Sequence, residues 1–119
     1  MYTKKIGLIL RHAPYGSDLA QEAIDALLSL SSYSSNISVI FMGDGIFQLL
    51  REQQPREKIK SIQKQLSALE LYDINSVFVC EHSLMERGIA ASTLSLPIKP
   101  LSLPTLRHII HEQDVLLSF

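Results

Sequence analysis

The sequence predicts an α/β fold, a three-layer α/β/α sandwich around a mainly parallel sheet of about five strands. Short apolar runs alternate with helical patterns along the chain. The runs are apolar at consecutive positions, which is typical of parallel strands covered by helices on both faces. With 119 residues and no internal repeat, the chain is expected to form a single domain over 1–119.

The segments expected to form strands consist mostly of Val, Ile, Leu and Phe, and turn or helix signals flank them. They cover residues 6–10, 37–42, 74–80, 94–98 and 115–119.

Helical spacing of apolar residues is found between these runs. A first helix is predicted to begin after an N-cap at Ser17 and to continue to about Leu30. A short helix is expected over 46–50, and a longer one from Arg56 to the Tyr72-Asp73 pair.

The last helix is expected to begin at Ser102, whose side chain suits an N-cap. Pro104 falls in its first turn, where proline is tolerated. Leu106, Ile109 and Ile110 share one face of this helix and are predicted to face the sheet.

Composition favours a compact globular domain in a reducing compartment. Hydrophobic residues make up 46% of the chain and charged residues 19%. The formal net charge of -1 gives no overall attraction to nucleic acid or membranes. The single cysteine cannot form an internal disulfide, and no apolar run approaches the roughly 20 residues of a membrane span. A cytoplasmic protein is therefore expected.

The motifs that bind nucleotides or phosphate are incomplete. Gly43-x-Gly45-x-x-Gln48 lacks the third glycine of a dinucleotide fingerprint, and no P-loop is present. A tight turn at Gly43-Asp44-Gly45 with one positive φ explains these glycines, with a weak anion site as the alternative. Arg11-His12 has the wrong charge for the magnesium site of a phosphoacceptor domain. We therefore expect no cofactor.

The histidines and the basic residues suggest surface positions. His108 and His111 lack a third ligand, so no metal site is expected. A solvated helix face explains the basic residues between the second and third strands, with RNA contact through phosphates as the alternative. These residues are Arg51, Arg56, Lys58, Lys60 and Lys64, offset by Glu52 and Glu57.

Cys80 is the candidate for chemistry. It ends a predicted strand, at the position where open α/β sheets place their active sites. His82 and Arg87 lie close in sequence and would lower the pKa of a nearby thiol, whereas Glu81 would oppose this. A buried, chemically inert cysteine at a strand end is the alternative.

Several short motifs extend over the whole chain. They are Ala13-Pro14-Tyr15-Gly16, Gly43-Asp44-Gly45-Ile46-Phe47-Gln48-Leu49-Leu50, Leu71-Tyr72-Asp73-Ile74, Val79-Cys80 with Glu86-Arg87-Gly88, and Asp114-Val115-Leu116 with Phe119. Together they resemble the TusC (DsrF-like) branch of the DsrE/DsrF family. The block from Gly43 to Leu50 is the most specific part of this resemblance.

The resemblance implies a part in a cytoplasmic sulfur relay. Proteins of this branch assemble with TusB-like and TusD-like chains into a heterohexamer, a dimer of heterotrimers. Such a complex receives persulfide sulfur from a TusA-like donor. It passes the sulfur through a TusE-like acceptor toward 2-thiolation of wobble uridine in tRNA. No direct contact with nucleic acid or membrane is expected.

The resemblance further implies that this chain is mainly a structural and docking subunit rather than an enzyme on its own. The family assigns the relaying cysteine to the TusD-like subunit. Apolar residues beside the glycine turn are the interface candidates, and burial in the chain's own core is their alternative. They are Ile46, Phe47, Leu49 and Leu50.

Two other functions stay open. The chain could itself carry persulfide on Cys80, which requires a thiol that partners can reach. It could also bind a small ligand as flavodoxins do, although the first loop offers only Tyr15 and Ser17 for this.

Overall fold

The computed structural model describes residues 4–13, 18–33, 36–50, 65–66, 74, 76–94 and 98–119. Within them, a sheet of five strands has the order β4-β3-β2-β1-β5, and each neighbouring pair is parallel. The strands are β1 (Ile6–Leu10), β2 (Ile37–Phe41), β3 (Ser76–Cys80), β4 (Lys99–Leu101) and β5 (Val115–Ser118). The helices are α1 (Leu19–Ser31), the 3-10 helix η1 (Gly43–Leu49), α3 (Glu81–Glu86), the 3-10 helix η3 (Ala91–Thr93) and α4 (Leu103–His111).

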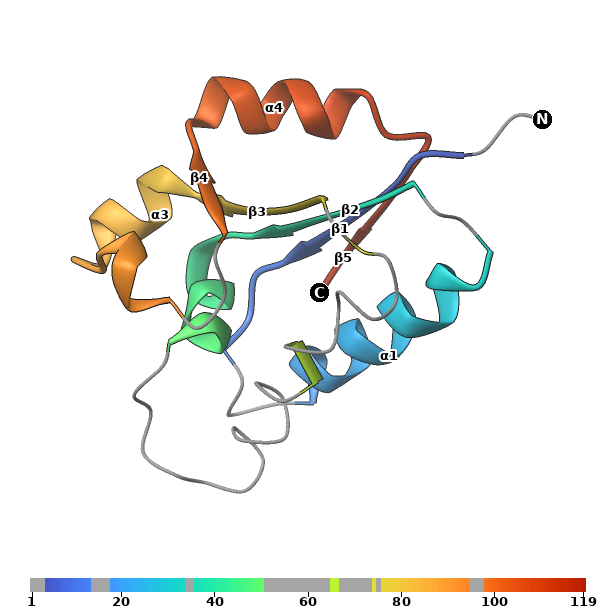
Figure 1. Cartoon of the computed structure of the whole chain (residues 1–119), viewed down its shortest axis with the longest axis horizontal. Coiled ribbons are helices and arrows are strands. Elements are labelled where there is room, and N and C mark those ends of the chain that lie inside the picture. Colours follow the sequence, from blue (N-terminus) through green and yellow to red (C-terminus); the bar gives the residue numbers. More distant parts are fainter. Residues whose placement is uncertain are drawn as a thin grey trace.

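The fold is a three-layer α/β/α sandwich, with α1 on one face of the sheet and α4 on the other (Figure 1). The chain advances from β1 through β2 and β3 to β4, and then returns across the sheet to place β5 beside β1. Because crossover connections between parallel strands are right-handed, this reversal of direction puts α4 on the face opposite α1.

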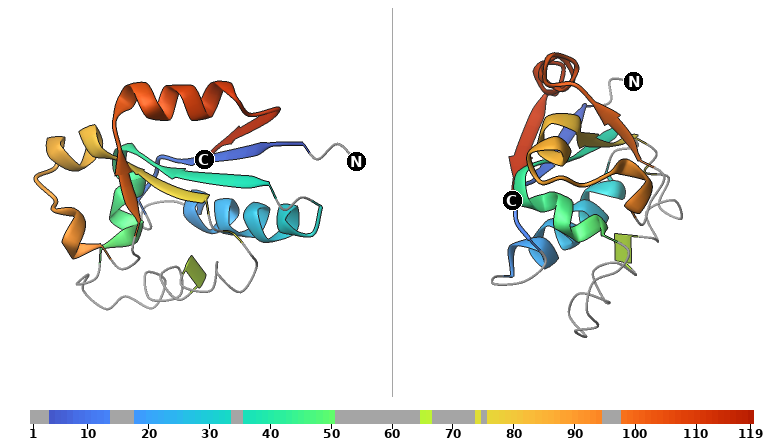
Figure 2. Two further views of the ribbon diagram at one scale, coloured as in Figure 1. Left: turned by 45° about the horizontal axis from the view of Figure 1, so that its top comes forward. Right: turned by 90° about the vertical axis from the view of Figure 1, so that its left-hand side faces the viewer.

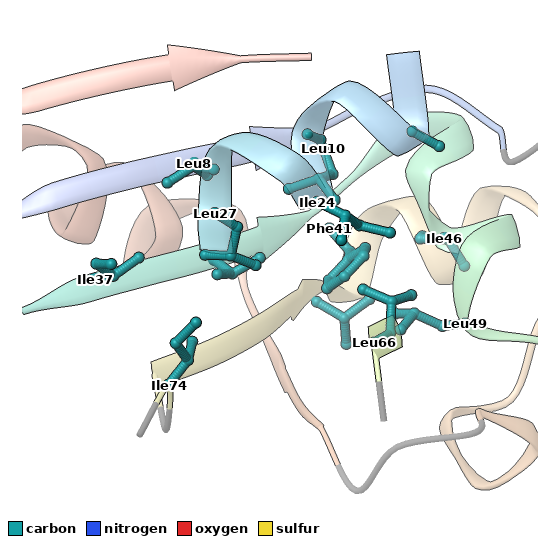
Figure 3. Packing of buried hydrophobic residues seen from close by; sticks show 14 of the residues in the cluster. Leu8, Leu10, Ile24, Leu27, Ile37, Phe41, Ile46, Leu49, Leu66 and Ile74 are labelled. Carbon is teal, nitrogen blue, oxygen red and sulfur yellow. The ribbon is translucent and has the colours of Figure 1, made fainter. Parts of the chain in front are cut away.

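The main core fills the space between α1 and the sheet. Ile24 and Leu27 of α1 meet Leu8 of β1 and Phe41 of β2 in a cluster of fully buried side chains (Figure 3). All residues of β1 and β2 are buried, as expected for the central strands of a covered sheet.

A smaller core lies under α4. Ile40, Cys80, Leu101 and Leu106 form a second buried cluster, against which Ile109 and other partly buried residues pack. The Ser102 side chain accepts a hydrogen bond from the Thr105 backbone N–H, as the sequence predicts for an N-cap.

The fourth strand lies later in the chain than the apolar run at 94–98 predicts. Leu94 forms an isolated antiparallel bridge with Leu50 and is buried in the main core, and residues 95–97 lie outside the described part of the chain. The strand β4 follows at Lys99–Leu101. Apolar character at Leu94 therefore reflects burial, whereas the edge strand itself contains a lysine and a proline, which weaken a strand pattern.

Other differences concern helix starts and ends. The helix expected over 46–50 is a 3-10 helix that begins earlier, at Gly43. Asp18 occupies the N-cap position of α1, and Ser17 lies outside the described residues. Of the helix expected from Arg56, only 65–66 are described, and Leu66 is buried.

No helix in the described part of the chain has both the length and the apolar character that crossing a bilayer requires.

Candidate functional site

The carboxyl ends of the parallel strands meet at one edge of the sheet, where open α/β folds bind ligands. Here η1 follows β2, α3 follows β3, and both lie at the same end of the molecule in two views (Figure 2). The candidate residues of the sequence, from Gly43 to Leu50 and from Cys80 to Arg87, therefore lie at this carboxyl edge.

Cys80 is the last residue of β3 and the N-cap residue of α3. It pairs in register with Leu101 of β4, and its exposed fraction is 1%. The thiol belongs to the small cluster that α4 covers, together with Ile40 and Leu106. The prediction of its position at the strand end is confirmed, but the thiol is enclosed.

The His82 and Arg87 side chains, which lie near Cys80 in sequence, contact carboxylates. His82 Nε2 lies 3.1 Å from Glu86 Oε1 on the exposed side of α3. Arg87 Nη2 lies 3.0 Å from Asp44 Oδ1. Among the described residues, no hydrogen bond or ion pair joins either side chain to the Cys80 thiol.

Instead, Arg87 and Ser83 connect α3 to the turn after β2. Ser83 Oγ accepts a hydrogen bond of 3.0 Å from the Gly43 backbone N–H. Arg87 donates to Asp44 Oδ1 and, through Nη1, to the Ser83 carbonyl at 3.2 Å. We call these four residues the η1–α3 bridge. Sequence reasoning missed it, because its partners are about 40 residues apart and no local pattern signals their pairing.

The turn at Gly43-Asp44-Gly45 has the tight geometry that was predicted. Gly43 has φ of 55°, a left-handed conformation that favours glycine. At Gly45, a Cβ would lie only 2.0 Å from the Leu10 carbonyl oxygen. Gly43 is thus favoured by its backbone conformation and Gly45 by the lack of space for a side chain. The close approach at Gly45 shows that η1 packs directly against the end of β1.

Gln48 joins η1 to the loop after β1. Its side chain is buried, and Nε2 donates a hydrogen bond of 2.8 Å to the His12 carbonyl. Gln48 Oε1 has no hydrogen-bond partner among the described residues. The bond to His12 holds the segment after β1 against η1.

The four interface candidates divide into two pairs. Ile46 and Leu49 are fully buried in the main core (Figure 3), so the alternative of core burial applies to them. Phe47 and Leu50 keep part of their surface exposed. The pattern did not single out Met85 of α3, although 72% of this apolar side chain is exposed.

The remaining candidates lie apart from this edge or outside the described residues. His108 Nε2 contacts Glu112 Oε1 at 2.8 Å, and His111 is exposed. Within the described residues, no three His, Cys, Asp or Glu side chains are placed to hold a metal ion. The basic residues from Arg51 to Lys64, and Tyr15 and Ser17 of the first loop, lie outside the described part.

Comparison with known proteins gives consistent matches along the chain. The DsrE/DsrF-like family model matches residues 4–119. The chain is 42% identical over 112 residues to "Protein TusC homolog" of Vibrio parahaemolyticus, covering 93% of this chain and 95% of that protein. It is 38% identical over 118 residues to "Protein TusC" of Buchnera aphidicola, covering 98% and 99% of the two chains.

Solved structures agree with this fold. The ychN protein from E. coli superposes with a TM-score of 0.77 at 26% identity, covering 98% of this chain and 99% of that one. The protein MTH1491 of Methanobacterium thermoautotrophicum has a TM-score of 0.70 at 11% identity, with the same coverage, and supports the fold alone.

Proposed function

Because this chain belongs to the DsrE/DsrF-like family, we propose that it is a structural and docking subunit of a TusBCD-type sulfurtransferase complex in the cytoplasm. Its similarity to proteins named TusC over nearly their whole length supports this assignment. The proposed partners are TusB-like and TusD-like subunits in a heterohexamer. The complex takes persulfide sulfur from a TusA-like donor and delivers it to a TusE-like acceptor, toward 2-thiolation of tRNA wobble uridine.

The burial of Cys80 is the observation that carries the docking role. In each step of a persulfide relay, an acceptor thiolate attacks the terminal sulfur of the donor persulfide. The donor S–S bond breaks, and the donor leaves as a thiolate. The attacking sulfur must therefore be ionised and reachable by a partner protein. Cys80 is 1% exposed and is packed among aliphatic side chains.

The carboxyl edge supplies a surface for the docking role. Phe47 and Leu50 are partly exposed beside Asp44, and α3 presents Met85 next to Glu86. The η1–α3 bridge holds these two helices together without any partner. Rigid presentation of apolar side chains lowers the entropy lost on binding.

The role of Cys80 is tested by replacing the gene with Cys80→Ser and Cys80→Ala variants and measuring 2-thiouridine in bulk tRNA by mass spectrometry. We expect both variants to co-purify with the partner subunits and to support thiolation close to the wild-type level. The Ser variant places a hydroxyl at the buried N-cap position of α3, which costs about 1–3 kcal/mol of stability if no backbone N–H of the helix bonds to it. The Ala variant lacks this hydroxyl and separates stability from chemistry.

The competing hypothesis, that the chain itself carries persulfide on Cys80, predicts a different result. Both variants would then assemble normally, while 2-thiouridine would fall nearly to zero. A persulfide on Cys80, detected by mass spectrometry of the complex after incubation with the sulfur donor, would support that hypothesis in the same way. Failure to co-purify with any TusB-like or TusD-like protein would contradict the docking role.

A further inference from the structure

The two edges of the sheet differ in their protection against pairing with another strand. The β4 edge is three residues long and contains Lys99 and Pro100. Lysine and proline are both typical of edges that do not accept a further strand, because proline has no N–H and a buried lysine is costly. The β5 edge, at the outer side of the sheet (Figure 2), contains neither a charge nor a proline from Val115 to Ser118.

The backbone of β5 alternates between bonding to β1 and pointing outward. Val115 N–H donates to the Lys5 carbonyl at 3.1 Å, and Phe119 N–H to the Ile9 carbonyl at 2.8 Å. In a parallel ladder of this register, every second residue of the strand directs its N–H and C=O groups away from β1. Between Val115 and Phe119 these outward residues are Leu116 and Ser118, both exposed.

We propose that β5 pairs antiparallel with the β5 strand of a second copy of this chain, across a two-fold axis at Leu117. In this register, Leu116 lies opposite Ser118 of the other copy. Such residues form a hydrogen-bonded pair that exchanges both N–H···O bonds. Two such pairs satisfy the outward backbone groups of both copies, and the sheet continues from one copy into the next.

The side chains of β5 favour a second copy as the occupant. Leu117 would lie opposite Leu117, and Val115 opposite Phe119, on the face that packs against the main core. Apolar cross-strand pairs stabilise a sheet, whereas like charges placed opposite each other destabilise it. No charged side chain lies between Val115 and Phe119, so a strand can meet its own copy without repulsion. The interface is isologous, as in most homodimers.

Light scattering of the isolated full chain tests this inference independently of the sulfur-relay function. We expect a dimer at micromolar concentration for the wild type. Leu116→Lys should raise the dimer dissociation constant about tenfold or more, because it places a charge on the pairing edge. Tyr33→Lys, which changes an even more exposed apolar side chain just after the carboxyl end of α1, is the matched control and should leave the dimer unchanged.

Hydrogen exchange of the wild-type chain gives a second readout that needs no variant. The amides of Leu116 and Ser118 should exchange rapidly at low protein concentration and slow down as the concentration rises. The amides of Val115 and Phe119, bonded within the chain, should be protected throughout. A wild-type chain that stays monomeric, a Leu116→Lys dimer as tight as the wild type, or outward amides insensitive to concentration would each overturn the inference. Loss of TusB-like or TusD-like binding by Leu116→Lys, with a monomeric wild type, would assign the edge to a different partner.

Discussion

At the scale of single residues, the glycines of the carboxyl edge have different roles, although the sequence presents them alike. Gly88 has φ of 63°, and no atom lies within 4 Å of the place that a Cβ would take. Only its left-handed backbone conformation therefore disfavours other residues at this position. Gly45 has an ordinary φ but no space, because a Cβ would meet the Leu10 carbonyl oxygen at 2.0 Å. A backbone atom in a central strand cannot move aside as a flexible side chain can.

Alanine substitutions should distinguish these two causes. Gly88→Ala should cost about 1–2 kcal/mol of unfolding free energy, the strain of a left-handed alanine. Gly88→Asn should recover part of this loss, since asparagine tolerates that conformation. Gly45→Ala should cost more than Gly88→Ala, and Gly45→Asn should give no recovery. Urea unfolding of the four variants measures the differences, and wild-type stability of Gly45→Ala would contradict this packing argument.

Sequence patterns located Cys80 but not its surroundings. The strand-end position follows from a local run of apolar residues, which a period-based argument can detect. The burial of Cys80 depends on Leu101 and Leu106, which come from later elements. The contact of Arg87 with Asp44 joins positions 43 residues apart. Such pairings arise from tertiary packing, so proximity in sequence did not reveal that Arg87 bonds to Asp44 and to the Ser83 carbonyl.

At the scale of elements, α3 is short yet well defined at both ends. Its carboxyl end forms a Schellman motif, in which Gly88 N–H donates to the Met85 carbonyl and Ile89 N–H to the Leu84 carbonyl. Ser83 in its first turn and Arg87 at its C-cap connect it to η1 through the η1–α3 bridge. Because a helix of this length is unstable by itself, these tertiary contacts maintain it.

Removing Arg87 should therefore loosen α3 more than it destabilises the whole chain. Asp44 is 61% exposed and the Arg87 side chain 24%, so solvent screening limits the cost of Arg87→Ala to about 1 kcal/mol. Arg87→Lys should rescue this only partly, because lysine lacks the planar group that reaches both Asp44 and the Ser83 carbonyl. Hydrogen exchange of the α3 amides should accelerate in both variants.

The exposed pair of Lys5 and Glu112, 3.5 Å apart, provides the control for this experiment. Lys5→Gln should change stability by less than about 0.5 kcal/mol and leave exchange in α3 unaltered. If Arg87→Ala also left α3 exchange unaltered, the bridge would have no role in holding the helix.

The sheet order explains why most strands were predictable and β4 was not. Strands β1 and β2 are central and wholly buried, so their sequences are apolar at nearly every position, with Ser38 as the polar exception. An edge strand of three residues has few such positions. The apolar run that begins at Leu94 was predicted as this strand, although Leu94 is buried in the main core.

At the scale of the whole molecule, surfaces for association lie at separate places. Phe47 and Leu50 follow the carboxyl end of β2, whereas the backbone groups of Leu116 and Ser118 line the outer edge of β5. The proposed partner docking and the proposed self-pairing therefore use different residues. Variants at one surface should leave the other intact, because distant sites without shared contacts act independently.

The docking surface is tested by comparing two neighbours on η1. Phe47→Asp changes a partly exposed side chain, whereas Leu49→Asp changes a buried one. We expect Phe47→Asp to abolish co-purification with the TusB-like and TusD-like subunits while the melting temperature of the isolated chain stays near that of the wild type. Leu49→Asp should prevent stable folding, because an unpaired charge in the core costs several kcal/mol. If Phe47→Asp instead melted like Leu49→Asp, Phe47 would be a core residue, and the partners would have to bind elsewhere on the chain.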